Sequence, residues 1–231
     1  MIYLKKFFFI RNITRKLGLN PFLFRILFRN KSYEQYFDNK FTSNLKFDDI
    51  VYDIGANVGY YSADFAKIVS NSGMVYAIEP SDINYQKLID KTKDISNIVA
   101  LNIAIGSKNG KLFISQGTDE LGANSRISIT ETKLGKWVDV ITLDNLVNLN
   151  VQPTAIKIDV EGFEIEVLKG AESTLKSSKL KMVGIEVHSS ILIENGINDG
   201  PFQIEKILKS NNFNIEWTDF SHIVAIRKET F

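Results

Sequence analysis

The stretch that decides the fold reads Tyr52-Asp53-Ile54-Gly55-Ala56-Asn57-Val58-Gly59-Tyr60. An apolar run leads into it and a helical pattern follows it, so we expect a buried parallel strand over 50–54, a tight turn and then a helix. Gly55 and Gly59 allow a sharp turn and a close approach to a ligand, because neither has a Cβ atom. The free amide groups at the helix start, near Tyr60 and Tyr61, would face whatever lies over the turn. The stretch predicts a nucleotide pocket.

A second apolar run, residues 74–78, ends at Glu79 and Pro80. In open α/β sheets an acid at this position accepts hydrogen bonds from the hydroxyls of a cofactor ribose. The dinucleotide fingerprint requires glycines at its first, third and sixth positions. Here Gly55 and Gly59 stand four apart with Asn57 between them, so an NAD-dependent oxidoreductase is disfavoured.

The spacing Asp-x-Gly-x-Asn-x-Gly from Asp53 to Gly59 resembles motif I of the class I, Rossmann-like methyltransferases that use S-adenosylmethionine. Downstream, the chain is similar to the FkbM family over about 48–187. The string that carries this likeness is Lys157-Ile158-Asp159-Val160-Glu161-Gly162-Phe163-Glu164, with Asp144-Asn145-Leu146 before it and Val167-Leu168-Lys169-Gly170-Ala171 after it. The resemblance implies transfer of a methyl group from S-adenosylmethionine to a hydroxyl oxygen, often on a sugar or a polyketide-type product.

The resemblance also implies where the cofactor binds. Backbone carbonyls with a nearby Asp53 suit its ammonium group, and the start of the helix suits its carboxylate. The expected cofactor contacts are Asp53, Gly55, Ala56, Asn57, Gly59, Tyr60, Tyr61, Glu79, Pro80, Asn102, Ile103, Ala104 and Asp159.

Methyl transfer to an alcohol requires an aligned acceptor and removal of a proton. The candidate bases are Asp159 first, His188 second and Glu161 third, with Lys157 as a further candidate catalytic residue. His188 suits the role because the pKa of histidine lies near neutrality. A salt bridge between Lys157 and Asp159 is the structural alternative.

Four acids are expected to converge beyond the carboxyl ends of the strands: Asp53, Glu79, Asp159 and Glu186. Asp159 and Glu161 are oxygen ligands of the kind that hold magnesium. The spacing shows no third ligand, so the sequence predicts no metal.

Composition fits one α/β domain, with 44% hydrophobic residues in 231 and no cysteine for a disulfide or a thiolate zinc site. We expect a doubly wound, mostly parallel sheet. Its remaining elements would be strands over 99–105, 155–158 and 182–187, an antiparallel pair over 112–115 and 137–141, helices over 82–94, 164–177 and 201–210, a closing hairpin over 213–217 and 223–227, and an irregular connection over 116–136.

The N-terminal segment differs from the rest. Residues 1–31 hold eight Lys or Arg and no acid, whereas the remaining 200 residues carry 20 bases against 27 acids. We expect helices over 3–17 and 21–29, within an N-terminal extension 1–45 that precedes a methyltransferase domain 46–231. Charges interrupt the extension too often for a membrane span, so it would either pack on the sheet or contact the inner face of the membrane of a cytoplasmic protein.

The mildly acidic body gives no support to nucleic acid as a substrate. The leading hypothesis is an oxygen-directed methyltransferase that acts on a hydroxyl of a sugar, glycan or related small molecule. Two alternatives remain. One is a methyltransferase that acts on RNA or protein, and the other is a non-catalytic module that binds the cofactor.

Overall fold

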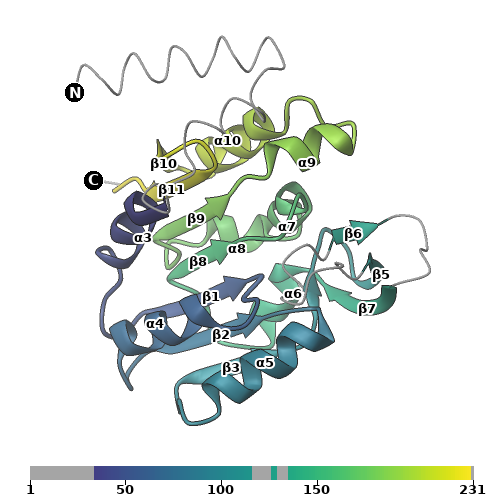
Figure 1. The fold of residues 1–231 in the computed structure, drawn as a ribbon. Helices are drawn as coiled ribbons and strands as arrows, with labels where there is room; N and C mark the ends of the chain where they lie inside the picture. The colour runs from purple at the N-terminus through teal and green to yellow at the C-terminus, as the bar shows by residue number, and fades with distance from the viewer. Residues whose placement is uncertain (1–33, 116–125, 129–134, 230–231) are drawn as a thin grey trace.

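The computed structural model describes residues 34–115, 126–128 and 135–229 (Figure 1). Its centre is a seven-stranded sheet with helices on both faces. In spatial order the strands are β10 (Phe213–Trp217), β11 (His222–Arg227), β9 (Met182–Glu186), β8 (Ala155–Ile158), β1 (Ile50–Ile54), β2 (Met74–Ile78) and β3 (Ile98–Leu101). The five strands from β9 to β3 are parallel, while β10 and β11 form an antiparallel hairpin at one edge. The expected mostly parallel sheet with a C-terminal hairpin is confirmed.

Alternation along the strands sends side chains to two different cores. Val51 and Val75 face the side covered by α3 (Glu34–Thr42) and α4 (Tyr60–Val69), where Phe65 is buried. Tyr52 and Tyr76 face the opposite side, and their rings lie 4.6 Å apart. That side is covered by α7 (Glu164–Lys169), α8 (Glu172–Lys176) and α10 (Gly200–Ser210) (Figure 1). Both faces are covered, which explains why the central strands are mostly apolar, with Asp53 in β1 and Lys157 in β8 as buried exceptions.

A second, four-stranded sheet packs beyond the carboxyl ends of the central strands (Figure 1). In spatial order it contains β4 (Ala104–Ile105), β7 (Gly135–Ile141), β5 (Gly110–Ser115) and β6 (Arg126–Ser128). The expected antiparallel pairing of 112–115 with 137–141 is present as β5 and β7. The connection expected to be irregular over 116–136 contains β6, which pairs with β5.

The prediction of a single strand over 99–105 is wrong. The chain leaves the central sheet after Leu101, and Ala104 pairs with Val140 of the second sheet. Asn102 fixes the break, because its side-chain amide donates to the carbonyl of Glu79 at 3.0 Å and to that of Pro80 at 3.2 Å.

The prediction of a single helix over 164–177 is also wrong, because the segment forms two helices, α7 and α8, that are separated at Gly170. A Cβ atom on Gly170 would lie 2.0 Å from the carbonyl oxygen of Gly106, so this position accepts no side chain. Asp144 then caps α8 by accepting hydrogen bonds from the backbone N–H groups of Ser173 at 2.9 Å and Thr174 at 2.8 Å.

Three helices were not expected: α3, α6 (Leu143–Asn148) and α9 (Ser189–Glu194). The helix expected over 82–94 is present as α5 (Asp82–Thr92), and the helix after the glycine turn is α4. The helices expected over 3–17 and 21–29 lie outside the described residues. Among the described helices, none is both long and apolar enough to cross a membrane.

We expect α3 to be a stabilising part of the fold. Phe41 is 0% exposed and its ring lies 5.2 Å from that of Phe65, whereas Phe47, just after the helix, is 73% exposed. Phe41→Ala should therefore lower the free energy of unfolding by about 3–5 kcal/mol. Phe47→Ala, the matched control, should change it by less than about 0.5 kcal/mol. Urea unfolding measures both, and equal effects would contradict the packing described for α3.

Candidate functional site

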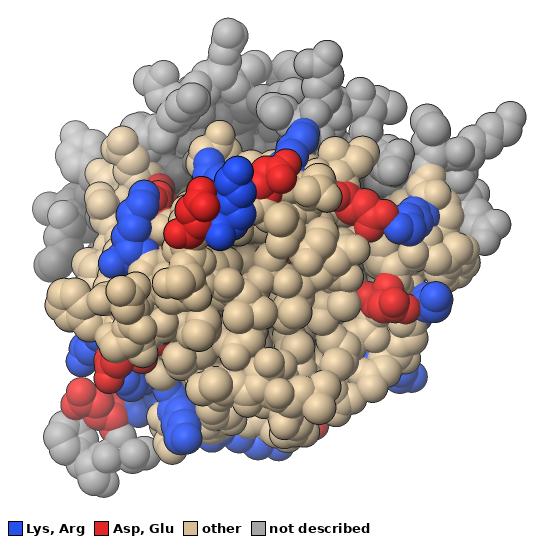
Figure 2. Space-filling model, turned by 90° about the horizontal axis from the view of Figure 1, so that it is seen from below, with Lys and Arg blue, Asp and Glu red and all other residues tan. Residues whose placement is uncertain are grey.

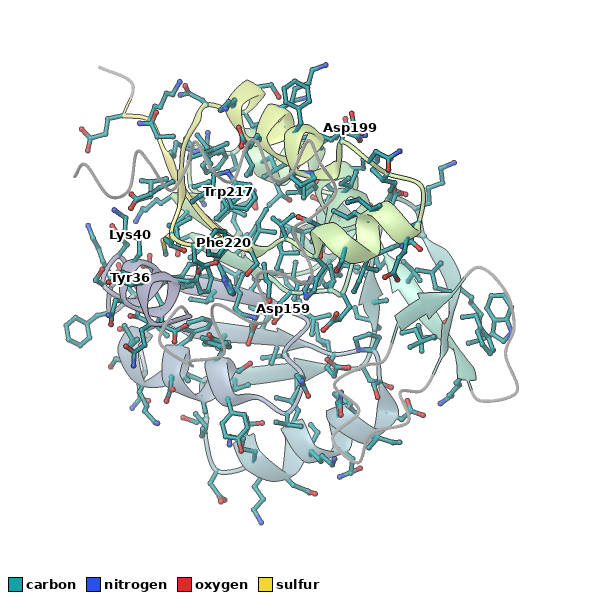
Figure 3. All side chains as sticks on the ribbon, turned by 45° about the horizontal axis from the view of Figure 1, so that its top comes forward. Tyr36, Lys40, Asp159, Asp199, Trp217 and Phe220 are labelled. Atoms are coloured by element: carbon teal, nitrogen blue, oxygen red, sulfur yellow. The ribbon has the colours of Figure 1, made fainter. Side chains whose placement is uncertain are left out.

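A pocket opens at the carboxyl ends of β1, β2 and β8, the usual ligand position in an open α/β sheet. Asp159, which follows β8, lies in the middle of the molecule, while Tyr36 on α3 points outward (Figure 3). The residues of the pocket wall that the sequence predicted are Gly55, Asn57, Glu79, Pro80, Ile103, Ala104, Asp159 and Glu161. The sequence did not predict Ser81, Asn84 and Phe163, which also line it.

The glycine turn has the expected left-handed backbone, with φ of 82° at both Gly55 and Gly59 and 52° at Asn57. The space that Cβ atoms would take at these two glycines is, however, occupied by other parts of the protein. A Cβ on Gly55 would lie 1.8 Å from the carbonyl oxygen of Asp159, and one on Gly59 would lie 2.5 Å from a methyl carbon of Leu88. Gly55 thus allows the loops after β1 and β8 to approach each other closely, and Gly59 allows Leu88 of the helix over 82–92 to pack against the turn.

Glu79 is the carboxylate that the turn holds in the pocket. It is only 6% exposed, and it accepts hydrogen bonds at 2.9 Å from the backbone N–H groups of Asn57 and Ser81. Burial raises the pKa of Glu79 to about 7, although both hydrogen bonds act to lower it. Each carboxylate oxygen has a further lone pair with which it can accept a ligand hydroxyl.

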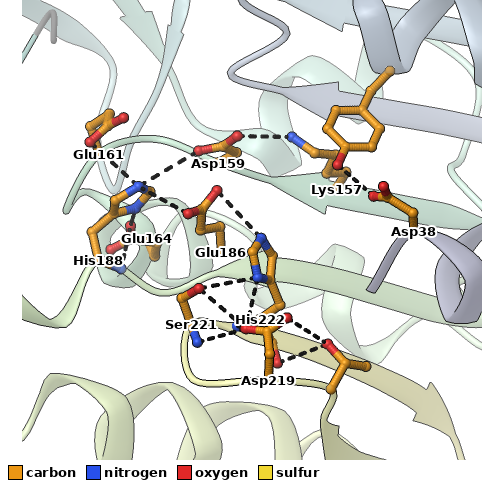
Figure 4. A network of polar contacts seen from close by, with 12 residues as sticks. Asp38, Lys157, Asp159, Glu161, Glu164, Glu186, His188, Asp219, Ser221 and His222 are labelled. Carbon is orange, nitrogen blue, oxygen red and sulfur yellow. Dashed lines mark hydrogen bonds and ion pairs between the residues drawn. The ribbon is translucent and has the colours of Figure 1, made fainter. Parts of the chain in front are cut away.

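Lys157 forms ion pairs with two carboxylates, Asp159 and Asp53, and Figure 4 shows the contact with Asp159. Its Nζ atom is 3.2 Å from Asp159 Oδ2, 3.7 Å from Asp53 Oδ1 and 4.6 Å from the ring centre of Tyr61. Burial lowers the pKa of Lys157, but Asp159 and Asp53 together raise it above its ordinary value. Lys157 therefore stays cationic and positions Asp159; it is not available as a proton acceptor.

His188, just after β9, faces a ring of carboxylates (Figure 4). Its Nδ1 atom is 2.7 Å from Oε1 of the fully buried Glu164, and its Nε2 atom is 3.4 Å from Glu161 Oε2 and 3.9 Å from Asp159 Oδ1. Burial lowers the pKa of His188, but the hydrogen bond to Glu164 and the neighbouring carboxylates raise it to about 9. The expectation of a pKa near neutrality is not met in this structure.

Glu186 joins this ring to the C-terminal hairpin. Its Oε1 atom is 3.8 Å from His188 Nε2, and its Oε2 atom is 3.5 Å from Nε2 of His222, whose Nδ1 is 2.9 Å from Asp219 Oδ1. Burial raises the pKa of Glu186, but the two histidines and Lys157 lower it to about 2. The sequence placed Asp219 and His222 only in a hairpin turn, because nothing local shows that strand register brings them to the site.

Several predicted residues do not line the pocket. Asp53 is fully buried and accepts a hydrogen bond from the Ser62 hydroxyl at 2.6 Å. Tyr60 is 68% exposed with Lys91 over its ring, and the hydroxyl of Tyr61 donates to Asp38 at 2.5 Å. The others outside the wall are Ala56, Gly59, Asn102, Lys157 and His188. The fold brings His188 to Asp159 and Glu161, so a third possible metal ligand lies beside them although the spacing in the sequence showed none.

A family model described as the methyltransferase FkbM domain matches residues 53–225. The chain belongs to the FkbM methyltransferase family. This confirms the resemblance found in the sequence and, at the level of the family, the expectation of a methyltransferase that uses S-adenosylmethionine.

The FkbM chain is similar to proteins from several organisms. It is 27% identical over 174 residues to the hexuronic acid methyltransferase AglP of Haloferax volcanii. This alignment covers 74% of this chain and 66% of AglP. A solved FkbM methyltransferase from Methylobacillus flagellatus superimposes with a TM-score of 0.56 at 19% identity, over 79% of this chain and 44% of that one. A solved protein described as a putative rRNA methylase from Clostridium thermocellum superimposes with a TM-score of 0.52 at 13% identity, and the match covers 87% of this chain and 98% of that one. These two structures share the fold.

The pKa of Glu79 gives a testable pH dependence of stability. The folded carboxyl holds its proton up to about pH 7, against an ordinary value of 4.5. Between these values the folded state binds more protons than the unfolded state, so this group's contribution to the free energy of unfolding falls as pH rises, by up to about 3 kcal/mol.

Glu79→Gln should remove that dependence, so wild type should lose stability relative to the variant between pH 5 and pH 8. Urea unfolding at both pH values measures the difference. Glu172→Gln, at an exposed position of α8, is the control and should track wild type. A constant difference between wild type and Glu79→Gln across this range would contradict the raised pKa.

Proposed function

We propose that this FkbM domain transfers a methyl group from S-adenosylmethionine to a hydroxyl of a sugar, and that hexuronic acids within glycans are the first acceptors to test. The observation that carries the proposal is the pocket at the strand ends, where Glu79 and Asp159 face the same space beside the glycine turn. The name of AglP, a hexuronic acid methyltransferase, supports the substrate class. The chain spans 66% of AglP, so activity is assigned to it only within this proposal.

The pocket fits the cofactor at its ribose end. Glu79 presents a carboxylate that backbone N–H groups hold in one orientation, as recognition of two neighbouring hydroxyls requires. When bound, S-adenosylmethionine supplies a methyl group that is already activated on a sulfonium. The protein therefore has to align the acceptor oxygen and take its proton.

Asp159 is the residue that we assign to the acceptor. It lines the pocket, and Lys157 holds one of its oxygens at 3.2 Å, so the other remains to orient or deprotonate a hydroxyl. His188 is cationic until about pH 9 with its present neighbours, which ranks it behind Asp159 as a proton acceptor near neutral pH. Glu161 also lines the pocket and remains the third candidate.

On the face shown in Figure 2, Lys and Arg lie beside Asp and Glu around a largely uncharged middle, and the described residues form no continuous basic area there. Nucleic-acid substrates normally bind to a continuous basic area. The contact of residues 1–31 with a membrane stays a prediction, because these residues lie outside the described part.

Cofactor binding tests the first half of the proposal. Wild type should bind S-adenosylmethionine in calorimetry, and Glu79→Ala should weaken binding by roughly 10- to 100-fold, since a hydrogen bond to a charged group contributes about 1.5–3 kcal/mol. Glu172→Gln should bind like wild type. If Glu79→Ala also binds like wild type, this carboxylate does not hold the ribose.

Turnover tests the second half. Asp159→Asn keeps the shape of the side chain and removes its charge, so methylation of a hexuronic-acid oligosaccharide, followed by mass spectrometry, should slow by about 10²- to 10⁴-fold. Cofactor affinity should change much less. Neutral sugars and RNA serve as competing acceptors. A wild-type protein that binds the cofactor but methylates none of them would instead be a binding module.

A further inference from the structure

Three metal-binding groups from two segments meet at one edge of the pocket. Asp159 and Glu161 follow β8 and His188 follows β9, and one ligand atom from each lies within 4.8 Å of the other two. We propose that Asp159, Glu161 and His188 form a binding site for one divalent cation of the Mn²⁺ type, which accepts mixed oxygen and nitrogen ligands. This proposal does not require methyl transfer to be correct.

The separations suit a shared cation. Two ligand atoms bound at about 2.1 Å lie about 3 Å apart at a right angle and about 4 Å apart when they are opposite. His188 Nε2 lies 3.4 Å from Glu161 Oε2 and 3.9 Å from Asp159 Oδ1. The side chains of Asp159 and Glu161 are 27% and 36% exposed, so small rotations can bring all three atoms onto one ion.

Glu164 provides an independent observation outside the ligand set. It is fully buried and accepts a hydrogen bond from His188 Nδ1 at 2.7 Å. A histidine that binds a metal through one nitrogen characteristically donates the other N–H to a carboxylate, which fixes its tautomer and ring orientation. Glu164 therefore directs Nε2, the nitrogen that gives up its proton when it binds an ion, toward Asp159 and Glu161.

The excess of negative charge around His188 also favours a bound cation. Even a protonated imidazole cannot balance the carboxylates around it, whereas a divalent cation offsets more of their charge. The acids whose oxygens lie within 4 Å of the His188 ring nitrogens are Asp159, Glu161, Glu164 and Glu186. Lys157 and His222, the other cations of this network, contact Asp159 and Glu186 from the far side.

Asp159 and Glu161 also line the pocket, so a cation held by them would have coordination positions open to it. Such positions are suited to an acceptor with neighbouring oxygen atoms, for example a hydroxyl beside a carboxylate. This extension to the acceptor rests on the proposed function, while binding of the cation does not.

The test is a titration of the full chain, stripped of metal with a chelator and dialysed, with MnCl₂ alone. Electron paramagnetic resonance reports free Mn²⁺, and spin-echo modulation reports nitrogen bound to the ion. We expect one Mn²⁺ per chain and an imidazole nitrogen signal. Glu161→Gln, the change at the most exposed ligand, should weaken binding at least tenfold, and His188→Gln should also remove the nitrogen signal.

Two further variants separate a built site from general attraction to acids. Glu164→Gln should weaken binding by roughly 10- to 100-fold although it touches no ion, because it orients His188. Glu172→Gln, an exposed acid of α8, should bind like wild type, and circular dichroism checks that each variant is folded. Wild type that binds no Mn²⁺ at millimolar concentration would overturn the proposal, as would equal binding by wild type, Glu161→Gln and His188→Gln.

No cofactor or acceptor enters this titration. A failure to bind Mn²⁺ therefore leaves the proposed methyl transfer standing, and a failure to methylate any acceptor leaves the titration result unchanged.

Discussion

One buried cation fixes the geometry of the candidate site. The ammonium group of Lys157 is almost completely removed from water, which is tolerated only when carboxylates surround it. Its two partners come from neighbouring parallel strands, Asp53 from β1 and Asp159 from the end of β8. The ion pair therefore ties the glycine turn to the loop that carries the proposed chemistry. Removing Lys157 would leave the buried Asp53 beside the half-buried Asp159 without a cation between them, so the pocket and the core cannot vary independently.

The central sheet could be predicted because its information is local. Apolar runs bounded by acids and glycines mark β1 and β2, and the parallel order follows from the helices between them. The sequence does not predict a strand end or a strand pairing that depends on residues far away in the chain. The break at Asn102 depends on carbonyl groups of the neighbouring strand end, and Ala104 extends a strand only because Val140 lies beside it. Neither partner can be identified from the residues around the break.

The candidate site likewise contains some residues that the sequence could predict and some contacts that it could not. Glu79 and Asp159 could be found from the sequence, because acids at the ends of parallel strands meet at one edge of the sheet. The environment of His188 could not, since Glu164 sets its tautomer and Glu186 reaches it from the preceding strand. A histidine considered alone suggests a neutral base. The same histidine among four carboxylates is a cation, or a ligand for one.

The contact between Glu186 and His222 has a consequence for the order of assembly. The parallel strands and the glycine turn all precede residue 187, so most of the pocket is synthesised before the hairpin that supplies His222. Until that hairpin pairs with β9, Glu186 lacks the imidazole that contacts its Oε2 atom, while its Oε1 atom lies beside His188. On the ribosome, the cofactor end of the pocket can thus form early, whereas the acidic end is completed only when the edge strand adds to the sheet.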